Sequence, residues 1–421
     1  MERLVFHVDV NSAYLSWEAA RRVSQGLEDL RLIPSAIGGD PAKRTGVILA
    51  KSIPAKKYGV QTGEPVAAAL RKCPQLQLAR PDFTLYEKNS KAFIAICRQY
   101  APVVEQVSID ECFLDMSGTA YLYPEPLEIA YRIKDHIRDA LGFTVNVGIS
   151  RNKLLAKMAS DFEKPDKVHT LFPEEIAAKM WPLPVRELFS VGSATADKLR
   201  RSSIYTIGEL AASDVRVIRQ LVGVKLGDQL HAYANGIDDS PVATEPEEAK
   251  GYSISTTLED DVRSAEDAKR ILLVLSDSVS AHMRREGAQA GCVSVTIRAN
   301  DFKNRSHQRR LDLVTDISDE IYTIAAELFD ELWDKKTPLR LLGIALTDIA
   351  RGEEAQLSLF ADARRERTRK REQAIDAIRQ KFGADTIVRG SSLEVPVSVG
   401  RRYRARAEQE RLEKEKTDLL D

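Results

Sequence analysis

The sequence predicts a multidomain protein of the α+β class with a charged C-terminal tail. The chain of 421 residues exceeds what one hydrophobic core accommodates, so we expect roughly two to four domains. Across residues 1–165, apolar runs typical of β-strands alternate with helical patterns, and residues 251–350 combine two helical patterns with several alternating strands. The contents of 43% hydrophobic and 30% charged residues are those of a soluble globular protein.

The composition also argues against several classes of protein. No apolar stretch approaches the ~20 residues that span a bilayer, and the N-terminus lacks the basic and apolar regions of a secretory signal. The cysteines Cys73, Cys97, Cys112 and Cys292 show no close spacing, which indicates reduced thiols in a cytoplasmic protein. The net charge of −1 argues against a nucleic-acid partner when taken alone, but a local basic face matters more than the sum.

Two predicted strands in the first part of the chain end in carboxylates. The run Leu4–His7 leads into Val8-Asp9-Val10-Asn11, and the run Val103–Val107 leads into Ser108-Ile109-Asp110-Glu111. A single aspartate at such a place is most often a turn former or a helix cap. These segments are otherwise apolar, however, and crowded carboxylates repel one another unless a cation lies between them. The joint pattern predicts two divalent metal ions roughly 3.5–4 Å apart, the arrangement with which polymerases and nucleases catalyse in-line displacement at phosphorus.

A further strand and a helix are expected next. Phe143–Ile149 has the composition of a strand, and Ser150 is expected to cap the helix that follows. The apolar face of this helix would consist of Leu154, Leu155, Met158 and Ala159.

The remainder of the chain changes character in steps. Residues 166–235 predict short helices separated by glycines, and residues 236–250 predict a linker rich in Asp, Glu, Pro and Ser. Cys292–Arg298 predicts a strand of the following region. Beyond Arg351 the chain is strongly charged; residues 374–382 have helical apolar spacing, and residues 401–421 predict a solvated helix or disorder.

Four motifs in this chain resemble those of one enzyme family. The motifs are Val8–Tyr14, Ser108–Glu111, Gly148–Lys157 and Arg340–Ile344. They resemble motifs of the Y-family translesion DNA polymerases, in particular the bacterial DNA polymerase IV branch, and the resemblance covers residues 1 to about 350. It implies a palm with a ferredoxin-like sheet, small fingers, a helix-hairpin-helix thumb, a linker, an α/β little finger and a tail. The palm would consist of residues 1–18 and 76–165, and the fingers of residues 19–75. The thumb would be residues 166–235, the linker 236–250, the little finger 251–350 and the tail 351–421.

By this resemblance, Asp9, Asp110 and Glu111 are the catalytic residues and hold two Mg²⁺ ions, for which Mn²⁺ is an expected substitute. Asp9 and Asp110 would bridge both ions, and Glu111 would bind the ion that lowers the pKa of the primer hydroxyl. The backbone carbonyl of Val10 would add a ligand, and attack on the α-phosphate would expel pyrophosphate. Asn11 stands where many relatives carry a second aspartate, and we leave it out of the metal set.

The resemblance also implies residues that bind the incoming deoxynucleotide. Tyr14 matches the steric gate that clashes with a ribonucleotide 2′-hydroxyl, although a tyrosine there is most often core packing. Lys56 and Lys157 are expected to bind the triphosphate, and Lys56 stands where arginine is common, so bidentate geometry is lost. Three neighbours depart from the family pattern: Ala13 replaces an aromatic residue, and Ala50 and Ile53 replace a threonine and a tyrosine that help to bind triphosphate.

Two segments are expected to bind DNA. In the first, a glycine turn opens a helix whose N-terminal amides would hold a backbone phosphate, through Gly192, Ser193, Thr195 and Lys198. In the second, a basic hairpin resembles part of the family's little finger and would bind phosphates through Arg298, Lys303, Arg305, Arg309 and Arg310. The alternatives are a generic turn between helices and a charged sheet edge that prevents aggregation.

The tail contains Gln356-Leu357-Ser358-Leu359-Phe360, which resembles the motif that binds the β subunit of the bacterial sliding clamp. A chance fragment is the alternative for so short a segment. Tethering to a clamp would raise the local concentration of an enzyme that grips DNA weakly.

The sequence therefore predicts a cytoplasmic, monomeric, low-fidelity translesion DNA polymerase that adds dNTPs to primer–template DNA, with no membrane association. One alternative is a palm-type nucleotidyl cyclase, which would need neither the thumb nor the basic hairpin. The other is a catalytically silent, clamp-associated accessory protein that binds DNA, which the loss of Asp9, Asp110 or Glu111 would have favoured.

Overall fold

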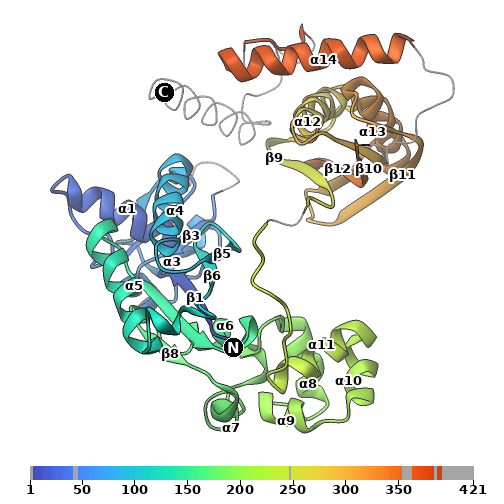
Figure 1. Cartoon of the computed structure of the whole chain (residues 1–421). Coiled ribbons are helices and arrows are strands. Elements are labelled where there is room, and N and C mark those ends of the chain that lie inside the picture. The colour runs from blue at the N-terminus through green and yellow to red at the C-terminus, as the bar shows by residue number, and fades with distance from the viewer. Residues whose placement is uncertain (1–2, 41–45, 246–247, 353–362, 384–385, 391–421) are drawn as a thin grey trace. The chain divides into compact units, whose positions relative to one another are not determined.

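The computed structural model describes residues 3–40, 46–245, 248–352, 363–383 and 386–390. The described residues form two compact units, one of residues 3–40 with 46–245 and one of residues 248–352 with 363–383 and 386–390, which we describe separately (Figure 1). None of the helices in the described ranges is long and apolar enough to cross a membrane.

The first unit is built on a five-stranded sheet, which we call the palm sheet. Its order is β5-β6-β1-β7-β8, and all pairs are antiparallel except β7 with β8. The strands are β1 (Val5–Val10), β5 (Val103–Gln106), β6 (Glu111–Asp115), β7 (Val145–Ser150) and β8 (Val168–Thr170). The order β7-β1-β6-β5, with helices in both crossovers, is the expected ferredoxin-like arrangement. The helices of this region are α1 (Ala13–Ser24), α4 (Phe83–Cys97), η1 (Thr119–Tyr121), α5 (Pro126–Leu141) and α6 (Lys153–Ser160).

Alternation along the strands divides the two faces of the palm sheet. Phe6, Val8 and Val10 pack into the core with residues of α1, α4 and α5. The intervening residues face the other side, where Val5 packs with Ala156 of α6. Gly148 allows α6 to approach β7, since a Cβ atom there would lie 2.0 Å from the Ala156 carbonyl oxygen.

The predicted helix is confirmed as α6, but the prediction that Ser150 caps it is wrong. Ser150 belongs to β7, and its hydroxyl donates to the Leu171 carbonyl at 2.5 Å. The cap is Asn152, whose side chain accepts from the Leu155 amide at 2.8 Å. The predicted apolar face of α6 packs into the core of the thumb region.

Residues 30–79 include a smaller sheet, which we call the fingers sheet, of order β3-β2-β4. It comprises β2 (Ser35–Gly38), β3 (Ile48–Lys51) and β4 (Gln77–Ala79), together with α2 (Ile53–Lys57) and α3 (Val66–Lys72). Both β4 and β8 lie beyond the expected domain boundaries at residues 75 and 165, because each pairs with a strand of the preceding domain. Cys97 and Cys112 lie with their sulfurs 3.8 Å apart, and all four cysteines are buried thiols.

The thumb region is helical, as expected. Its elements are η2 (Pro173–Glu175), α7 (Ile176–Lys179), η3 (Val185–Glu187), α8 (Ser193–Arg201), α9 (Ile207–Ala212), α10 (Val215–Val222) and α11 (Val224–Ala234). Gly223, at φ +93°, joins α10 to α11 in a helical hairpin. The first part of the predicted linker then packs on the palm: Val242 is buried beside Phe113, and the Ala243 amide donates to Glu105 at 2.7 Å.

The second unit is a four-stranded antiparallel sheet with helices on one face, which we call the little finger. The strand order is β11-β10-β12-β9. The strands are β9 (Tyr252–Val262), β10 (Ala288–Ala299), β11 (Asn304–Thr315) and β12 (Leu339–Arg351), and the helices are α12 (Ala265–Arg285) and α13 (Ser318–Leu332). The strand predicted at Cys292–Arg298 is confirmed within β10.

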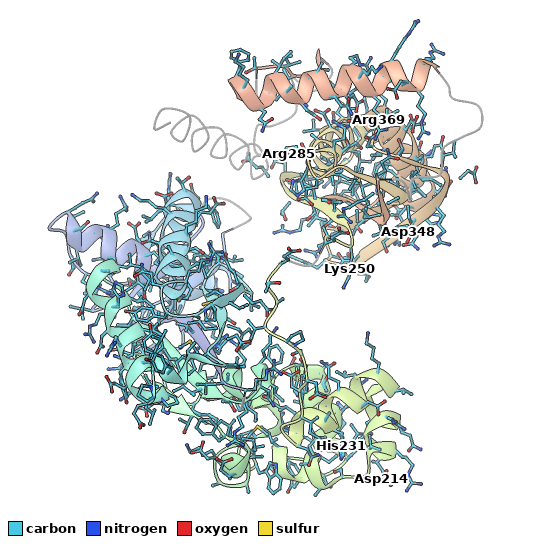
Figure 2. The ribbon with its side chains drawn as sticks, in the orientation of Figure 1. Asp214, His231, Lys250, Arg285, Asp348 and Arg369 are labelled. Carbon is cyan, nitrogen blue, oxygen red and sulfur yellow. The ribbon has the colours of Figure 1, made fainter. Side chains whose placement is uncertain are left out.

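A further helix, α14 (Ala363–Phe382), belongs to this unit and confirms the helical spacing seen in the tail. It is joined to the little finger by ion pairs. Arg284 of α12 binds Glu372 at 2.6 Å and Asp376 at 2.7 Å, and both Arg284 and Glu372 have side chains about 95% buried. Arg369, labelled in Figure 2, binds Asp316 at 2.8 Å. Other pairs are Arg365–Glu320, Arg371–Asp319, Arg379–Asp277 and Arg389–Asp319.

Candidate active site

Two neighbouring strands of the palm sheet bring the predicted carboxylates together. Asp9 of β1 lies directly opposite Glu111 of β6, and Asp110 immediately precedes β6. Because cross-strand partners share a face, Asp9 and Glu111 both point to the α6 side. The backbone also ties the two segments, since the Val10 amide donates to the Asp110 carbonyl at 3.0 Å.

Each carboxylate has its own partner. The Asp9 side chain binds the Lys164 ammonium, and Asp110 accepts from the Ser108 hydroxyl at 2.6 Å. Glu111 accepts from Lys157 at 2.8 Å and lies 3.2 Å from His7. The two strand residues differ electrostatically: burial raises the pKa of Asp9 despite Lys164, whereas the hydrogen bond with His7 and then Lys157 lower the pKa of Glu111 to about 2.

The donor chemistry of this site fits a divalent cation. Within the described ranges, no three His, Cys, Asp or Glu side chains converge on one point. Two observations nevertheless favour a cation. Asp9 is 7% exposed and carries a charge that its burial disfavours, and the buried Oδ1 atom of Asn11 has no hydrogen-bond partner. The carboxylate oxygens of Asp9 and Asp110, which line one pocket, are the hard donors that Mg²⁺ and Mn²⁺ prefer.

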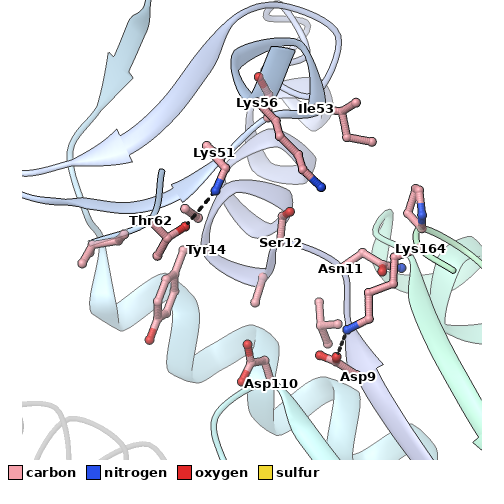
Figure 3. Close-up of a pocket in the computed structure, with 16 residues that line it drawn as sticks. Asp9, Asn11, Ser12, Tyr14, Lys51, Ile53, Lys56, Thr62, Asp110 and Lys164 are labelled. Atoms are coloured by element: carbon pink, nitrogen blue, oxygen red, sulfur yellow. Dashed lines mark hydrogen bonds and ion pairs between the residues drawn. The ribbon is translucent and has the colours of Figure 1, made fainter. Parts of the chain in front are cut away.

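A cavity of about 420 Å³ lies between the palm sheet and the fingers sheet (Figure 3). Asp9 and Asp110 line one side of it. Lys51, Ile53 and Lys56, from β3 and α2, line the other. The pocket thus sets carboxylates of the palm against lysines of the fingers.

Tyr14 lines this pocket from the start of α1. Its ring also packs against Tyr86, with centroids 4.8 Å apart, and against Trp17 at 5.9 Å. Both interpretations of this residue are therefore compatible with its place: part of the ring belongs to the core, and part faces the cavity. Ala13, just before it, is buried.

The two lysines predicted to bind triphosphate lie in different places. Lys56 lines the pocket, and its ammonium has no ion-pair or hydrogen-bond partner among the described residues. Ala50 and Ile53 line the pocket as well. Lys157 does not line the pocket; it binds Glu111 and lies 3.8 Å from Asp161. Its contact with triphosphate remains a prediction.

Several pocket residues were absent from the sequence prediction, among them Lys51, Thr62 and Lys164. Lys164 binds Asp161 at 2.7 Å as well as Asp9, so its ammonium lies at the palm side of the cavity. Its only signal in the sequence is that it follows Lys157 by two helical turns, just beyond the end of α6.

In the thumb, the predicted phosphate-binding residues lie together at the start of α8. Gly192 is the N-cap, and Gly192, Ser193 and Lys198 are exposed. Thr195 is half-buried, while Ala196 and Leu199 point into the core.

The basic residues of the little finger are divided between its two faces. The register pairs Arg309 with Val293 and Arg305 with Ile297, and both partners belong to the core beneath the helices. Arg309 accordingly binds Glu327 and Glu331 of α13.

Arg298 and Arg310 instead lie on the face that the helices leave uncovered. Arg310 binds Asp348 of β12 at 2.9 Å, Arg298 binds Asn304 at 2.7 Å, and Lys303 in the turn pairs with Asp301. Figure 2 labels Asp348 on this sheet. The residues directly opposite Arg310 and Arg298 on this face are Cys292 and Leu341. The face also carries small polar side chains: Ser253, Ser255, Ser294, Thr296 and Ser306. Such a face can approach a polyanion closely.

A pocket that sets carboxylates against lysines beside a ferredoxin-like sheet is typical of the palm-type nucleotidyl transferases. Comparisons with known proteins identify the family. Residues 8–161 match the impB/mucB/samB family, residues 249–359 match the C-terminal domain of that family, and residues 186–238 match the thumb domain of DNA polymerase-iota. The chain belongs to the Y family of translesion DNA polymerases.

Similar proteins extend over nearly the whole chain. A DNA polymerase IV of Clostridium acetobutylicum is 42% identical, over 94% of this chain and 99% of that protein. DNA polymerase IV 1 of Bacillus subtilis is 36% identical, over 93% of this chain and 94% of that protein. Among solved structures, the Y-family DNA polymerase chimera Dbh-Dpo4(243-245)-Dbh has a TM-score of 0.72 at 22% identity, covering 83% of this chain and 100% of the chimera, which supports the fold.

The family excludes the nucleotidyl cyclase alternative, because the matches include a thumb and a C-terminal domain. The predicted clamp-binding residues, Gln356 to Phe360, lie outside the described residues, as do residues 401–421.

Proposed function

We propose that the cavity between palm and fingers is the site where this translesion DNA polymerase adds a deoxynucleotide to a primer 3′ end. The observation that carries the proposal is the opposition of Asp9 and Asp110, on the palm side, to Lys56, on the fingers side, across one pocket. Carboxylates bind cations and lysines bind phosphates, so this pocket could bind a metal-bound triphosphate through both its metal and its phosphate groups.

Asp9, Asp110, Glu111 and the Val10 carbonyl would hold two Mg²⁺ ions, with Mn²⁺ as a substitute. When bound, such ions lower the pKa of the primer hydroxyl and neutralise the charge that develops at the α-phosphate. The primer 3′ oxygen would form a bond to the α-phosphorus while the bond from that phosphorus to the pyrophosphate oxygen breaks, and pyrophosphate leaves with the electron pair.

The side chains of the pocket would bind and select the nucleotide. Lys56 and Lys164 would hold the triphosphate as point charges, and to do so Lys164 would leave its bond with Asp9 and donate to a phosphate oxygen. Lys157 and His7 keep Glu111 ionised and oriented. Tyr14 would exclude a ribonucleotide by a steric clash between its ring and the 2′-hydroxyl, because packing against Tyr86 and Trp17 fixes the position of the ring.

Binding of primer–template DNA would come from the other two regions. The exposed amides at the start of α8 would hold a backbone phosphate, and the uncovered face of the little finger would bind phosphates through Arg298, Lys303 and Arg310. Both contacts are independent of sequence, as synthesis on many templates requires.

The C-terminal motif Gln356–Phe360 would bind the β subunit of the sliding clamp, and the chain would act as a monomer in the cytoplasm. Four buried thiols without a disulfide support a reducing compartment. Replacing Leu359 and Phe360 with alanine should abolish stimulation of primer extension by the clamp and leave synthesis without the clamp intact. Equal stimulation before and after the change would remove this part of the proposal.

The test of the catalytic proposal is extension of a primed DNA template with Mg²⁺ and dNTPs. Wild-type protein should extend the primer, and Asp110→Asn should reduce the rate by at least about a thousandfold. Asp115→Asn is the matched control, because Asp115 lies at the other end of β6 and outside the pocket, and it should retain wild-type activity. A folded wild-type protein that extends no primer, or an active Asp110→Asn variant, would refute the proposal.

A further inference from the structure

The fingers side of the pocket carries a second lysine that the family resemblance does not assign. Lys51 is the last residue of β3 and lines the cavity together with Lys56, which lies on the adjoining helix α2 (Figure 3). Its ammonium donates to the Thr62 hydroxyl at a long 3.4 Å, and Thr62 also lines the cavity. Two positive charges therefore face the same space from one wall.

Lys51 has no carboxylate partner among the described residues. An ammonium group has three donors, and one long bond to a neutral hydroxyl leaves most of that capacity unused. Burial, followed by the positive charge of Lys56, lowers the pKa of Lys51. The two lysines thus repel each other in the pocket, and an anion between them would relieve that repulsion.

The apolar residues on the same wall define what Lys51 has to supply. Ala50 and Ile53 line the cavity but have no side-chain group that can donate a hydrogen bond. Lys164, the third lysine of the pocket, is held on the palm side by Asp9 and Asp161. Among the described residues on the fingers side, the pocket-lining side chains that can donate to an anion are Lys51, Lys56 and Thr62, because the Ser52 hydroxyl already donates to the Ile33 carbonyl at 2.7 Å.

We propose that Lys51 is a substrate-binding residue that holds the triphosphate of the incoming nucleotide together with Lys56. The inference rests on the proposed function, since it names how this chain holds the substrate of that site. Lys51 would leave Thr62 and turn to the phosphate oxygens, so that two mobile point charges grip the nucleotide from the fingers side. The contact is blind to the base, because every dNTP carries the same triphosphate.

Inorganic tripolyphosphate separates a phosphate contact from any contact with sugar or base. Its binding to the full-length chain is measured by titration calorimetry with and without Mg²⁺, beside kcat and KM for each of the four dNTPs in single-nucleotide incorporation. For Lys51→Ala we expect tripolyphosphate binding about tenfold weaker, and KM raised by a similar factor for all four dNTPs, with kcat within about twofold of wild type. Lys51→Arg, which keeps the charge, should restore both constants to within about threefold.

Lys57→Ala is the matched control, because Lys57 is exposed on the same helix α2 but does not line the pocket. It should change neither constant. A loss that Lys57→Ala reproduces would refute the inference, since it would arise from net charge alone. Unchanged tripolyphosphate binding in Lys51→Ala, or a KM change confined to some bases, would also refute it, because Lys51 would then serve the base or the template.

The failure of the underlying function gives a different result. Wild-type protein that extends no primer would refute the proposed polymerase site, whereas the calorimetric comparison of Lys51→Ala with wild type would still decide whether Lys51 binds a triphosphate. If a Lys51→Ala variant extended primers with the kcat and KM of wild type, the role of Lys51 would be refuted and the proposed polymerase function would stand.

Discussion

Replacement of Arg284 with methionine should detach α14 from the little finger. The guanidinium of Arg284 binds Glu372 and Asp376 of α14 and donates to the Asp316 carbonyl at 2.5 Å. Methionine keeps much of the side-chain length but removes every one of these bonds. It leaves Glu372, 4% exposed, without its closest positive charge.

The expected cost follows from what Glu372 retains. Removing one partner of a buried ion pair costs about 3–5 kcal/mol. The Ser318 amide and hydroxyl still donate to Glu372, at 2.9 and 3.0 Å, so we expect the lower end, about 3 kcal/mol. Burial raises the pKa of Glu372 above its ordinary value, and loss of Arg284 would raise it further. A carboxyl with a raised folded-state pKa is favoured in its protonated form, so the cost should shrink as the pH falls through that pKa and grow as the pH rises.

Hydrogen exchange of the α12 and α14 amides in increasing urea measures this unit separately from the palm. A loss of about 3 kcal/mol accelerates exchange roughly a hundredfold, at 1.4 kcal/mol per factor of ten. Arg270→Met is the control, because Arg270 forms an exposed pair with Glu266 on the same helix and should cost less than about 1 kcal/mol. Exchange in Arg284→Met within a few fold of the Arg270→Met control would show that the buried pair does not hold α14.

Three further predictions concern the palm and the DNA-binding face. Tyr14→Ala should lower discrimination against ribonucleotides at least tenfold in single-nucleotide incorporation, whereas Tyr14→Phe, which keeps the packing against Tyr86, should leave it unchanged; equal discrimination in both variants would remove the gate. Arg310→Ala should lower the slope of log Kd for duplex DNA against log salt concentration by about 1. Arg309→Ala should alter this slope less, because Arg309 is paired with Glu327 and Glu331. A larger effect of Arg309→Ala would contradict the assignment of the two arginines to opposite faces. Gly148→Ala should destabilise the palm by about 3 kcal/mol or more, because the new Cβ atom would clash with backbone atoms of α6. Gly192→Ala is the control in urea unfolding, since no atom lies within 4 Å of a Cβ atom there. Similar unfolding midpoints for the two variants would contradict the close packing of α6 on β7.

The carboxylates of the site were predictable because charge interrupts an apolar strand. Asp9 lies in a run whose other members are buried, and period-two alternation indicates which face it takes. The same rule assigns the faces of β11 only indirectly. In Ser306–Arg310 no residue is apolar, so the face of Arg309 can be read only from Leu311, two residues further along the strand, which packs against the core.

Lys51, Thr62 and Lys164 could not be found from spacing. Lys51 and Thr62 meet within the fingers region, Lys164 comes from beyond the end of α6, and a lysine considered in isolation is most often solvated. The prediction of the N-cap of α6 failed for a local reason. Ser150 and Asn152 are both good caps, and the choice depended on where β7 ended, which is the least predictable part of any element.

The ion pairs of α14 give the little finger a charge balance that depends on the C-terminal segment. Arg365, Arg369, Arg371, Arg379 and Arg389 neutralise Asp277, Asp316, Asp319 and Glu320 on the side opposite the uncovered sheet face. A chain truncated after residue 362 would present these four carboxylates to solvent as an acidic surface. Screening at physiological salt acts over about 8 Å, comparable to the thickness of one structural layer, so that surface would repel a DNA duplex approaching the sheet most strongly in dilute buffer. A shortened protein could thus bind DNA weakly although every DNA-binding residue was intact.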